Sequence, residues 1–493
     1  MDNTSRPALL LVVGRSIGLA ASFAIGIVLA RLFAPEVFGT YKQFFLVYAT
    51  LYGVLQLGMA ESLYYFVPRA SEKTGRYVAN AMAVLIAVGL GCTAALYAAR
   101  TALAGWINAE LADYVLPLGL FLTFTLASTV FEIVLIARKK HLAAAVTYAV
   151  SDMVRTALFI LPALMVVSLR AVFLGATAFA ALRLAATVAA LWREFGRELR
   201  LDLPVLRLQL AYALPFAMAV GIEVVLINVH QYVVAARFDA ATFALYAIGC
   251  LQIPLYDLIV TSTVNVLMVR MAGGPRDGTA LQLWHDTVSR LALLIFPLAA
   301  LLLVGAHHLI VGLFTATYAE SVPIFRIWVL TMLPAVMAVD AVLRVYAETR
   351  FLLLINVVRL VCVAGLIGVF LSAFGLTGAV LVTLVAMTAA KTLGLVRIAW
   401  VLRAGPSQLL PWRRLAGIAT IALVSAVPVL WLQAAAAAWP PLVIFIAGST
   451  LYCVTYAVLA YTGAQVFGRH DPPEYALPLA GGQGLKSVIS PRP

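Results

Sequence analysis

The chain alternates between long apolar runs and short polar breaks. Most runs hold about 20 residues or more, and a helix of that length, rising about 1.5 Å per residue, crosses a hydrocarbon core of about 30 Å. The pattern therefore predicts an all-α polytopic membrane protein of about fourteen transmembrane helices. They are expected near residues 8–32, 42–67, 78–100, 114–136, 143–165, 171–192, 209–236, 241–268, 286–307, 322–348, 351–372, 376–399, 414–433 and 441–463.

The first two runs, within residues 8–69, form a hairpin, and part of it recurs later in the chain. The segment ARLFAPEVFGTY (30–41) aligns, with a shift of one residue, with AARFDAATFALY (235–246), which pairs Arg31 with Arg237 at an offset of 206 residues and Phe38 with Phe243 at an offset of 205. Internal repeats of this kind build many transporters from two helical bundles. We therefore expect a six-helix lobe in 1–200, a second in 201–400, two additional helices in 401–463 and a tail in 464–493.

Composition supports this interpretation. Of the 493 residues 64% are apolar and 11% are charged, against about 25% charged in a typical soluble domain. No small-residue cleavage site follows the first apolar run, so the first helix is expected to be retained. The four cysteines fall singly inside apolar runs, which indicates neither a disulfide framework nor a thiolate metal site.

The net charge of +13 is distributed unevenly between the two sides of the predicted membrane. Four basic residues lie in one set of connections (Lys42, Arg100, Arg170 and Arg237), whereas the alternate connections and the tails hold twenty-one. The positive-inside rule then places both termini in the cytoplasm. Since topology accounts for the basic excess, nucleic acid is not expected as a partner.

Two motifs of the hairpin carry a resemblance to a known family. They are VLARLFAPEVFGTY (28–41) and GMAESLYYFVPR (58–69). With two six-helix repeats and two appended helices, the chain resembles the polysaccharide and O-antigen flippases of the multidrug/oligosaccharidyl-lipid/polysaccharide exporter superfamily. The resemblance implies two lobes around a central cavity, alternating access, and transfer of an undecaprenyl-pyrophosphate-linked oligosaccharide from the inner to the outer leaflet of the bacterial cytoplasmic membrane. It also implies that a glycan polymerase and glycosyltransferases of the same pathway are partners.

The chain departs from the lipid II flippase group of that superfamily. That group is expected to carry cavity arginines on helices 1, 2 and 8, whereas here helix 1 supplies Arg15, and helices 2 and 8 supply Glu61 and Asp257. This difference argues against a peptidoglycan precursor as the substrate.

Basic residues at membrane depth are the candidates for binding a pyrophosphate head group, because arginine binds phosphate as a bidentate fork. Arg15 and Arg359 are the first choices, with Lys391 and Arg183 as further candidates. The alternative is that intramembrane charges neutralise one another. Asp152 with Arg155, and Asp340 with Arg344, have the helical spacing for such ion pairs.

Acidic residues at membrane depth are candidates for coupling to a proton or a sodium ion, because burial disfavours their charged form. Glu223, near the middle of helix 7, is the first, followed by Asp257 and Glu61. The alternative is a hydrogen-bonded contact between helices. No other cofactor and no resident metal are expected.

Aromatic residues follow helical spacing along helix 2, namely Tyr41, Tyr48 and Tyr52 with Phe44 and Phe45. Such a row could stack on sugar rings in the cavity, although packing between helices and an interfacial aromatic belt are the commoner roles.

Two other functions compete with the flippase. A drug or cation exporter of the same superfamily would favour an acidic, aromatic cavity. A membrane glycan polymerase or ligase would need a long external loop with catalytic side chains, and the sequence has neither such a loop nor a phosphate-loop, HExxH or GxSxG motif. We therefore expect a transporter rather than an enzyme.

Overall fold

A computed structural model describes residues 18, 21–69, 73–272 and 278–467. These residues form helices without a β-strand. Twelve of the helices are long and apolar enough to cross a membrane, or thirteen when the bent pair α2 and α3 is counted as one span. The all-α polytopic prediction is confirmed. Of the predicted first helix, 8–32, the structure describes Gly18 and the helix Ala21–Leu32.

The first lobe contains the helices up to Phe195. Its second span begins at Pro35, earlier than the predicted residue 42, because proline suits the first helical turn and Glu36 complements the positive end of the helix. The span bends by 41° between α2 and α3, where Leu57 and Gly58 have positive φ angles. The elements are α2 (Pro35–Leu55), α3 (Met59–Phe66), α4 (Thr74–Ala98), α5 (Arg100–Trp106), η1 (Ala109–Tyr114), α6 (Val115–Ala137), α7 (His141–Val166) and α8 (Leu169–Phe195).

The second lobe repeats this plan with more interruptions. The predicted span 241–268 is divided into α10 (Ala240–Gly249) and α11 (Pro254–Ala272), and the span 322–348 into α13 (Ser321–Leu330), η4 (Leu333–Met337) and α14 (Val339–Val345). Pro254 is the first residue of α11 and Pro334 is the second of η4, and both positions follow a break because proline lacks the N–H that a continuous helix needs. The continuous helices of this lobe are α9 (Leu203–Arg237), α12 (Gly278–Phe314), α15 (Thr349–Phe374) and α16 (Leu376–Leu402).

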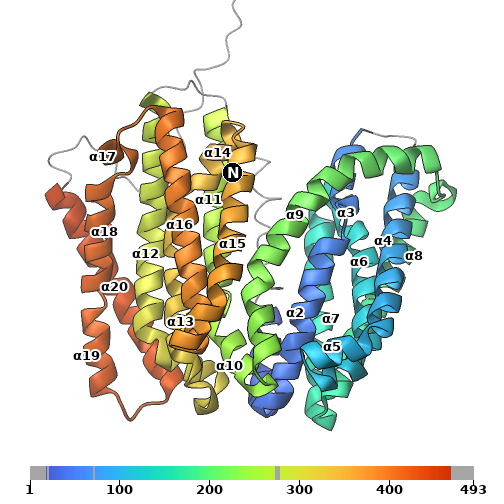
Figure 1. The fold of residues 1–493 in the computed structure, drawn as a ribbon, viewed down its shortest axis with the longest axis horizontal. Helices are drawn as coiled ribbons and strands as arrows, with labels where there is room; N and C mark the ends of the chain where they lie inside the picture. Colours follow the sequence, from blue (N-terminus) through green and yellow to red (C-terminus); the bar gives the residue numbers. More distant parts are fainter. Residues whose placement is uncertain (1–17, 19–20, 70–72, 273–277, 468–493) are drawn as a thin grey trace, which may run out of the picture.

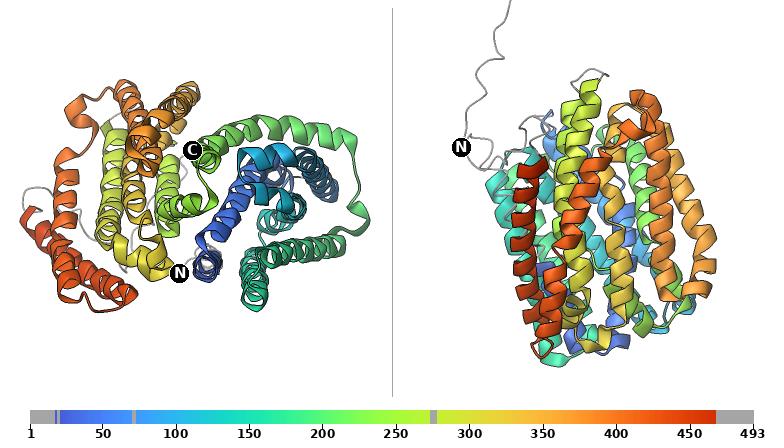
Figure 2. Two further views of the ribbon diagram at one scale, coloured as in Figure 1. Left: turned by 60° about the horizontal axis from the view of Figure 1, so that its bottom comes forward. Right: turned by 90° about the vertical axis from the view of Figure 1, so that its left-hand side faces the viewer.

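Helix α9 connects the lobes. Its beginning packs against α3 and α4 of the first lobe, and it also packs against α2, α10, α15 and α16. The additional helices α18 (Trp412–Val424), α19 (Val427–Ala435) and α20 (Pro441–Phe467) follow the short α17 (Pro406–Leu409). Of these, α18 and α20 pack against α12 on the outer side of the second lobe (Figures 1 and 2).

The lobes meet at one end of the molecule, which we call the packed end and which lies at the bottom of Figure 1. There α2 packs along α10, and the backbone of Ala240 occupies the space that a side chain on Gly39 would need. The Phe38 ring meets Tyr318 at 6.0 Å between centroids. Arg31 donates hydrogen bonds to the Leu313 carbonyl at 2.7 Å and to the Gly312 carbonyl at the end of α12. The lobes diverge toward the opposite end (Figure 1).

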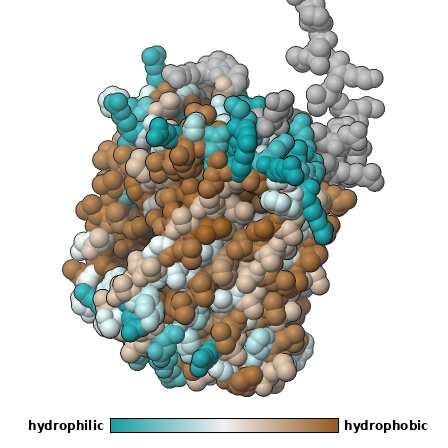
Figure 3. Space-filling view, turned by 90° about the vertical axis from the view of Figure 1, so that its right-hand side faces the viewer, coloured by the Kyte–Doolittle hydropathy of each residue, from teal (hydrophilic) through white to brown (hydrophobic). Residues whose placement is uncertain are grey.

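The surface between the two ends is largely apolar. Figure 3 shows apolar side chains over much of one side of the molecule, with hydrophilic ones gathered toward the two ends. Large apolar residues such as Met165 on α7 and Val269 on α11 are exposed. An apolar surface of this kind suits contact with lipid, where helices satisfy their backbone polar groups internally.

Candidate functional site

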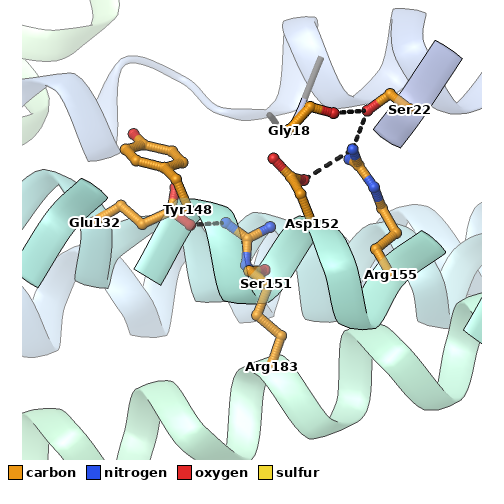
Figure 4. A pocket seen from close by; sticks show the side chains of 8 residues that line it. All are labelled: Gly18, Ser22, Glu132, Tyr148, Ser151, Asp152, Arg155 and Arg183. Carbon is orange, nitrogen blue, oxygen red and sulfur yellow. Dashed lines mark hydrogen bonds and ion pairs between the residues drawn. The ribbon is translucent and has the colours of Figure 1, made fainter. Parts of the chain in front are cut away.

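A polar cavity of about 330 Å³ lies inside the first lobe (Figure 4). Four helices surround it. Gly18 and Ser22 come from the first helix, Glu132 from α6 and Arg183 from α8, while α7 contributes Tyr148, Ser151, Asp152 and Arg155. Gly18 permits close packing here, because the Asp152 carboxylate occupies the position that a Cβ on residue 18 would take. The lack of a side chain at residue 18 thus shapes this cavity.

The charges of this cavity are paired. Arg155 binds Asp152 at 2.8 Å along α7, which confirms the predicted pair, and it also donates to the Ser22 hydroxyl. Arg183 binds Glu132 at 2.6 Å across the interface between α8 and α6. The sequence analysis missed Glu132, although a carboxylate within the apolar run 114–136 is itself a signal. Two positive and two negative charges leave the cavity without net charge, an environment better suited to hydroxyl groups than to a pyrophosphate.

The predicted tyrosine row divides into a buried residue and two partly exposed ones. Tyr41 is only 7% exposed and packs against Phe38, Phe45 and Phe173, an arrangement that fits the helix-packing alternative. Tyr48 and Tyr52 stack on each other at 5.6 Å. Both lie close enough to Arg183 to interact with it electrostatically.

A second group of charges lies in the second lobe. Lys391 on α16 forms an ion pair with Asp340 on α14 at 2.5 Å. The predicted pair of Asp340 with Arg344 is therefore wrong: Asp340 binds the lysine of the facing helix, and Arg344 is exposed. The Lys391 side chain is only 13% exposed, so the ion pair neutralises a largely buried ammonium group that was predicted to bind the head group.

Arg359 differs from the other arginines predicted to bind the head group. It lies on α15 and is half-buried, and it forms no hydrogen bond or ion pair with any residue that the structure describes. Its Nε is buried without a partner. Asp340 and Glu223 act on it electrostatically, without direct contact. A half-buried guanidinium with an unused donor can bind an anionic group.

The other predicted residues are placed as follows. Arg15 lies outside the described residues. Glu223 on α9 and Asp257 on α11 are exposed. Glu61 on α3 is half-buried, and its Oε2 is buried without a hydrogen-bond partner. Within the described ranges, no three histidine, cysteine, aspartate or glutamate side chains are grouped to hold a metal ion.

Comparison with known proteins identifies the family of this chain and solved structures that share its fold. A family model described as polysaccharide biosynthesis protein matches residues 28–323. No curated protein matches the sequence. Among solved structures, the lipid II flippase MurJ in an inward closed conformation shares 12% identity and a TM-score of 0.72, over 94% of this chain and 100% of that chain.

Two further structures share the fold. An inward-facing multidrug resistance transporter of the MATE family has 16% identity and a TM-score of 0.59, over 80% of this chain and 99% of its own. A transporter of the MOP superfamily from Pyrococcus furiosus, whose binding pocket is described as reversed in polarity, has 15% identity and a TM-score of 0.56. The match covers 81% of this chain and 95% of that chain. At these identities the likeness establishes the fold alone.

Proposed function

Because this chain belongs to the polysaccharide biosynthesis protein family, we propose that it is a flippase that moves an undecaprenyl-pyrophosphate-linked oligosaccharide from the cytoplasmic to the outer leaflet by alternating access. The family and the fold are those of membrane transporters and flippases rather than of enzymes. The proposal adds the substrate and the direction of transport.

The unpaired guanidinium of Arg359 is the observation that carries the proposal. An uncompensated charge within a membrane-spanning helix costs about 2.5–3.5 kcal/mol on insertion scales. The other two predicted basic residues within the described part of the chain, Arg183 and Lys391, are neutralised by carboxylates. Arg359 retains free donors, and arginine is well suited to bidentate contact with phosphate. Arg15 is proposed as its counterpart on the first helix.

The neutral cavity of the first lobe suits the glycan rather than the pyrophosphate. Carboxylate, guanidinium, serine and tyrosine groups supply both donors and acceptors for sugar hydroxyls. Tyr48 and Tyr52, which are partly exposed and stacked on each other, are proposed to offer ring faces for stacking on a sugar. In this proposal the pyrophosphate lies between Arg359 of the second lobe and Arg15 of the first helix, while the sugars extend toward the cavity of the first lobe.

Orientation in the membrane follows from the distribution of charge along the sequence. The connections with most of the basic residues, such as 138–140 and 193–207, are proposed to face the cytoplasm, with both termini, in the bacterial inner membrane. The packed end then faces outward. A glycan polymerase and glycosyltransferases are the proposed partners, and Glu223, Asp257 and Glu61 the candidates for coupling to a proton or a sodium ion.

The first test removes the guanidinium. Arg359→Ala is expected to abolish translocation of a fluorescent lipid-linked oligosaccharide in proteoliposomes, with Arg359→Lys restoring it in part, since an ammonium group supplies charge without the fork. Arg344→Ala is the matched control, because Arg344 is exposed on the neighbouring helix α14.

A second candidate function is favoured by the exposed carboxylates Glu223 and Asp257, which could attract an organic cation. An exporter of cations would tolerate Arg359→Ala and lose activity with Glu223→Gln. Normal glycan translocation by Arg359→Ala in a correctly inserted protein would refute the role proposed for this residue.

A further inference from the structure

A second cavity, of about 560 Å³, opens on the side of the molecule between the two lobes. Thr50 of α2 and Trp106 of α5 contribute from the first lobe, and α9 and α15 provide the rest of the wall. Helices α9 and α15 lie side by side in Figure 1 and pack against each other. We call this cavity the interlobe groove. Its volume falls within the range of about 300–1,000 Å³ that is usual for ligand sites.

The groove is long enough to extend across about one leaflet of a membrane. Its α9 wall runs from Val225 to Arg237, a rise of about 18 Å at about 1.5 Å per residue. Half of a hydrocarbon core of about 30 Å is about 15 Å. The wall is mainly aliphatic, and Gly365 and Gly368 leave room along α15. These dimensions fit one extended acyl chain.

The end of the groove at the packed end is cationic. Arg237 lies in the last turn of α9, and its guanidinium is 3.9 Å from the position that a Cβ on Gly368 would take. The side chain therefore lies over α15. Beside it, Trp106 stacks on Tyr232 with ring centroids 5.9 Å apart and planes 8° apart. Aromatic and basic side chains gathered in this way are typical of the level of lipid headgroups.

Arg237 is available to a ligand, unlike the arginine that corresponds to it in the internal repeat. Its counterpart in the alignment, Arg31, donates to the carbonyls at the end of α12 and so joins the two lobes. Arg237 forms no hydrogen bond or ion pair with any residue in the described part of the chain. No acidic residue lines the groove, so the amine of a zwitterionic headgroup would find no carboxylate there.

We propose that the interlobe groove is a binding site for an anionic glycerophospholipid of the leaflet at the packed end. One acyl chain lies along α9 and α15, and the phosphate contacts Arg237. Because the walls come from both lobes, separating the lobes at the packed end would divide the site. A bound lipid therefore stabilises the arrangement in which this end is closed.

The test uses the purified full-length protein and two lipids with identical acyl chains, phosphatidylglycerol and phosphatidylcholine. Native mass spectrometry is expected to show preferential retention of phosphatidylglycerol. Arg237→Gln should reduce that preference about fivefold, the factor that corresponds to one basic residue near an anionic headgroup. Arg100→Gln is the matched control, since Arg100 belongs to the same set of connections and lies over the Tyr97 ring.

Two further measurements locate the lipid. Gly368→Leu should fill the groove and reduce retention of both lipids. Phosphatidylglycerol with brominated acyl chains should quench the part of the fluorescence that Trp106→Phe removes. An unchanged preference in Arg237→Gln, an equal loss in Arg100→Gln, or unchanged retention in Gly368→Leu would overturn the proposal. Displacement of phosphatidylglycerol by an equimolar polyprenyl phosphate would assign the groove to a carrier lipid and would also overturn it.

Discussion

At the scale of single residues, the partner of each intramembrane charge decides what the charge can do. Arg183 and Lys391 are neutralised by Glu132 and Asp340 on other helices, whereas Arg359 has no such partner among the described residues. A buried pair adds little net stability, but the loss of one member leaves an uncompensated charge. Paired and unpaired arginines therefore respond differently to substitution.

The pair of Glu132 with Arg183 allows a direct test, because the two side chains are only 7% and 20% exposed. Arg183→Met should destabilise the protein by about 3–5 kcal/mol, since it leaves the Glu132 carboxylate buried and unpaired. The double variant with Glu132→Leu should recover most of that loss. Thermal unfolding in detergent measures both effects.

Transport by the double variant then separates structure from binding. If the cavity holds sugar, the double variant is stable but inactive, because the apolar replacements offer no hydrogen bonds. A stable double variant with full activity would show that the pair is structural and would remove the cavity from the proposed glycan path.

At the scale of elements, the start of α9 is fixed by a polar cluster around Asp202, which lies just before the membrane-spanning helix. Asp202 accepts a hydrogen bond from the Val205 N–H as the N-cap of α9, and it forms an ion pair with Arg76 of α4 at 2.7 Å. Asn80 of α4 bonds the Asp202 backbone at both its N–H and its carbonyl. The helix that connects the lobes is thus anchored to the first of them.

This anchor predicts a dependence on pH. The hydrogen bond from Arg76, followed by that from the Val205 N–H, lowers the pKa of Asp202 below its ordinary value of 3.8. A lowered pKa means that the stabilisation is complete above pH 3.8 and disappears as the pH falls through the lower, folded-state value. Asp202→Asn, which keeps a good N-cap, should lower the melting temperature at pH 7 and have progressively less effect below pH 3.8. An equal decrease in melting temperature at pH 7 and below pH 3.8 would indicate that the Asp202 charge does not stabilise the protein.

At the scale of the whole molecule, the alternating access proposed above requires the packed end to separate. Apart from the connecting helix α9, the most extensive contact between the lobes is that of α2 with α10. It depends on the direct approach of Gly39 to the Ala240 backbone, which cannot move aside as a flexible side chain could. Interfaces packed this closely tend to switch between discrete arrangements rather than deform.

Gly39→Leu should therefore prevent the packed end from closing. In a background without the four native cysteines, Ala244→Cys is expected to be protected from maleimide, because Ala244 on α10 is fully buried. Adding Gly39→Leu should expose it to labelling and reduce transport. Gly91→Leu is the control, since no atom lies within 4 Å of the position of its Cβ. Continued protection of residue 244 in Gly39→Leu would show that the interface repacks.

The sequence by itself determined the helical class, the approximate limits of most spans and the ion pair of Asp152 with Arg155, whereas it predicted fourteen spans against the twelve or thirteen found in the described residues. Apolar length dictates a membrane helix because the backbone must bond to itself in lipid, and a spacing of three residues places two side chains on the same face of one helix. The repeat of 30–41 in 235–246 is likewise visible in the sequence.

Only the tertiary structure decided the partners across helices. Glu132 forms an ion pair with Arg183, and Asp340 forms one with Lys391 rather than with Arg344. Such pairings depend on how each helix is rotated and packed against its neighbours. The same holds for the repeat-related arginines: Arg31 reaches the end of α12, whereas Arg237 lies over the interlobe groove. Residues equivalent in sequence acquire different roles because the two lobes surround them differently.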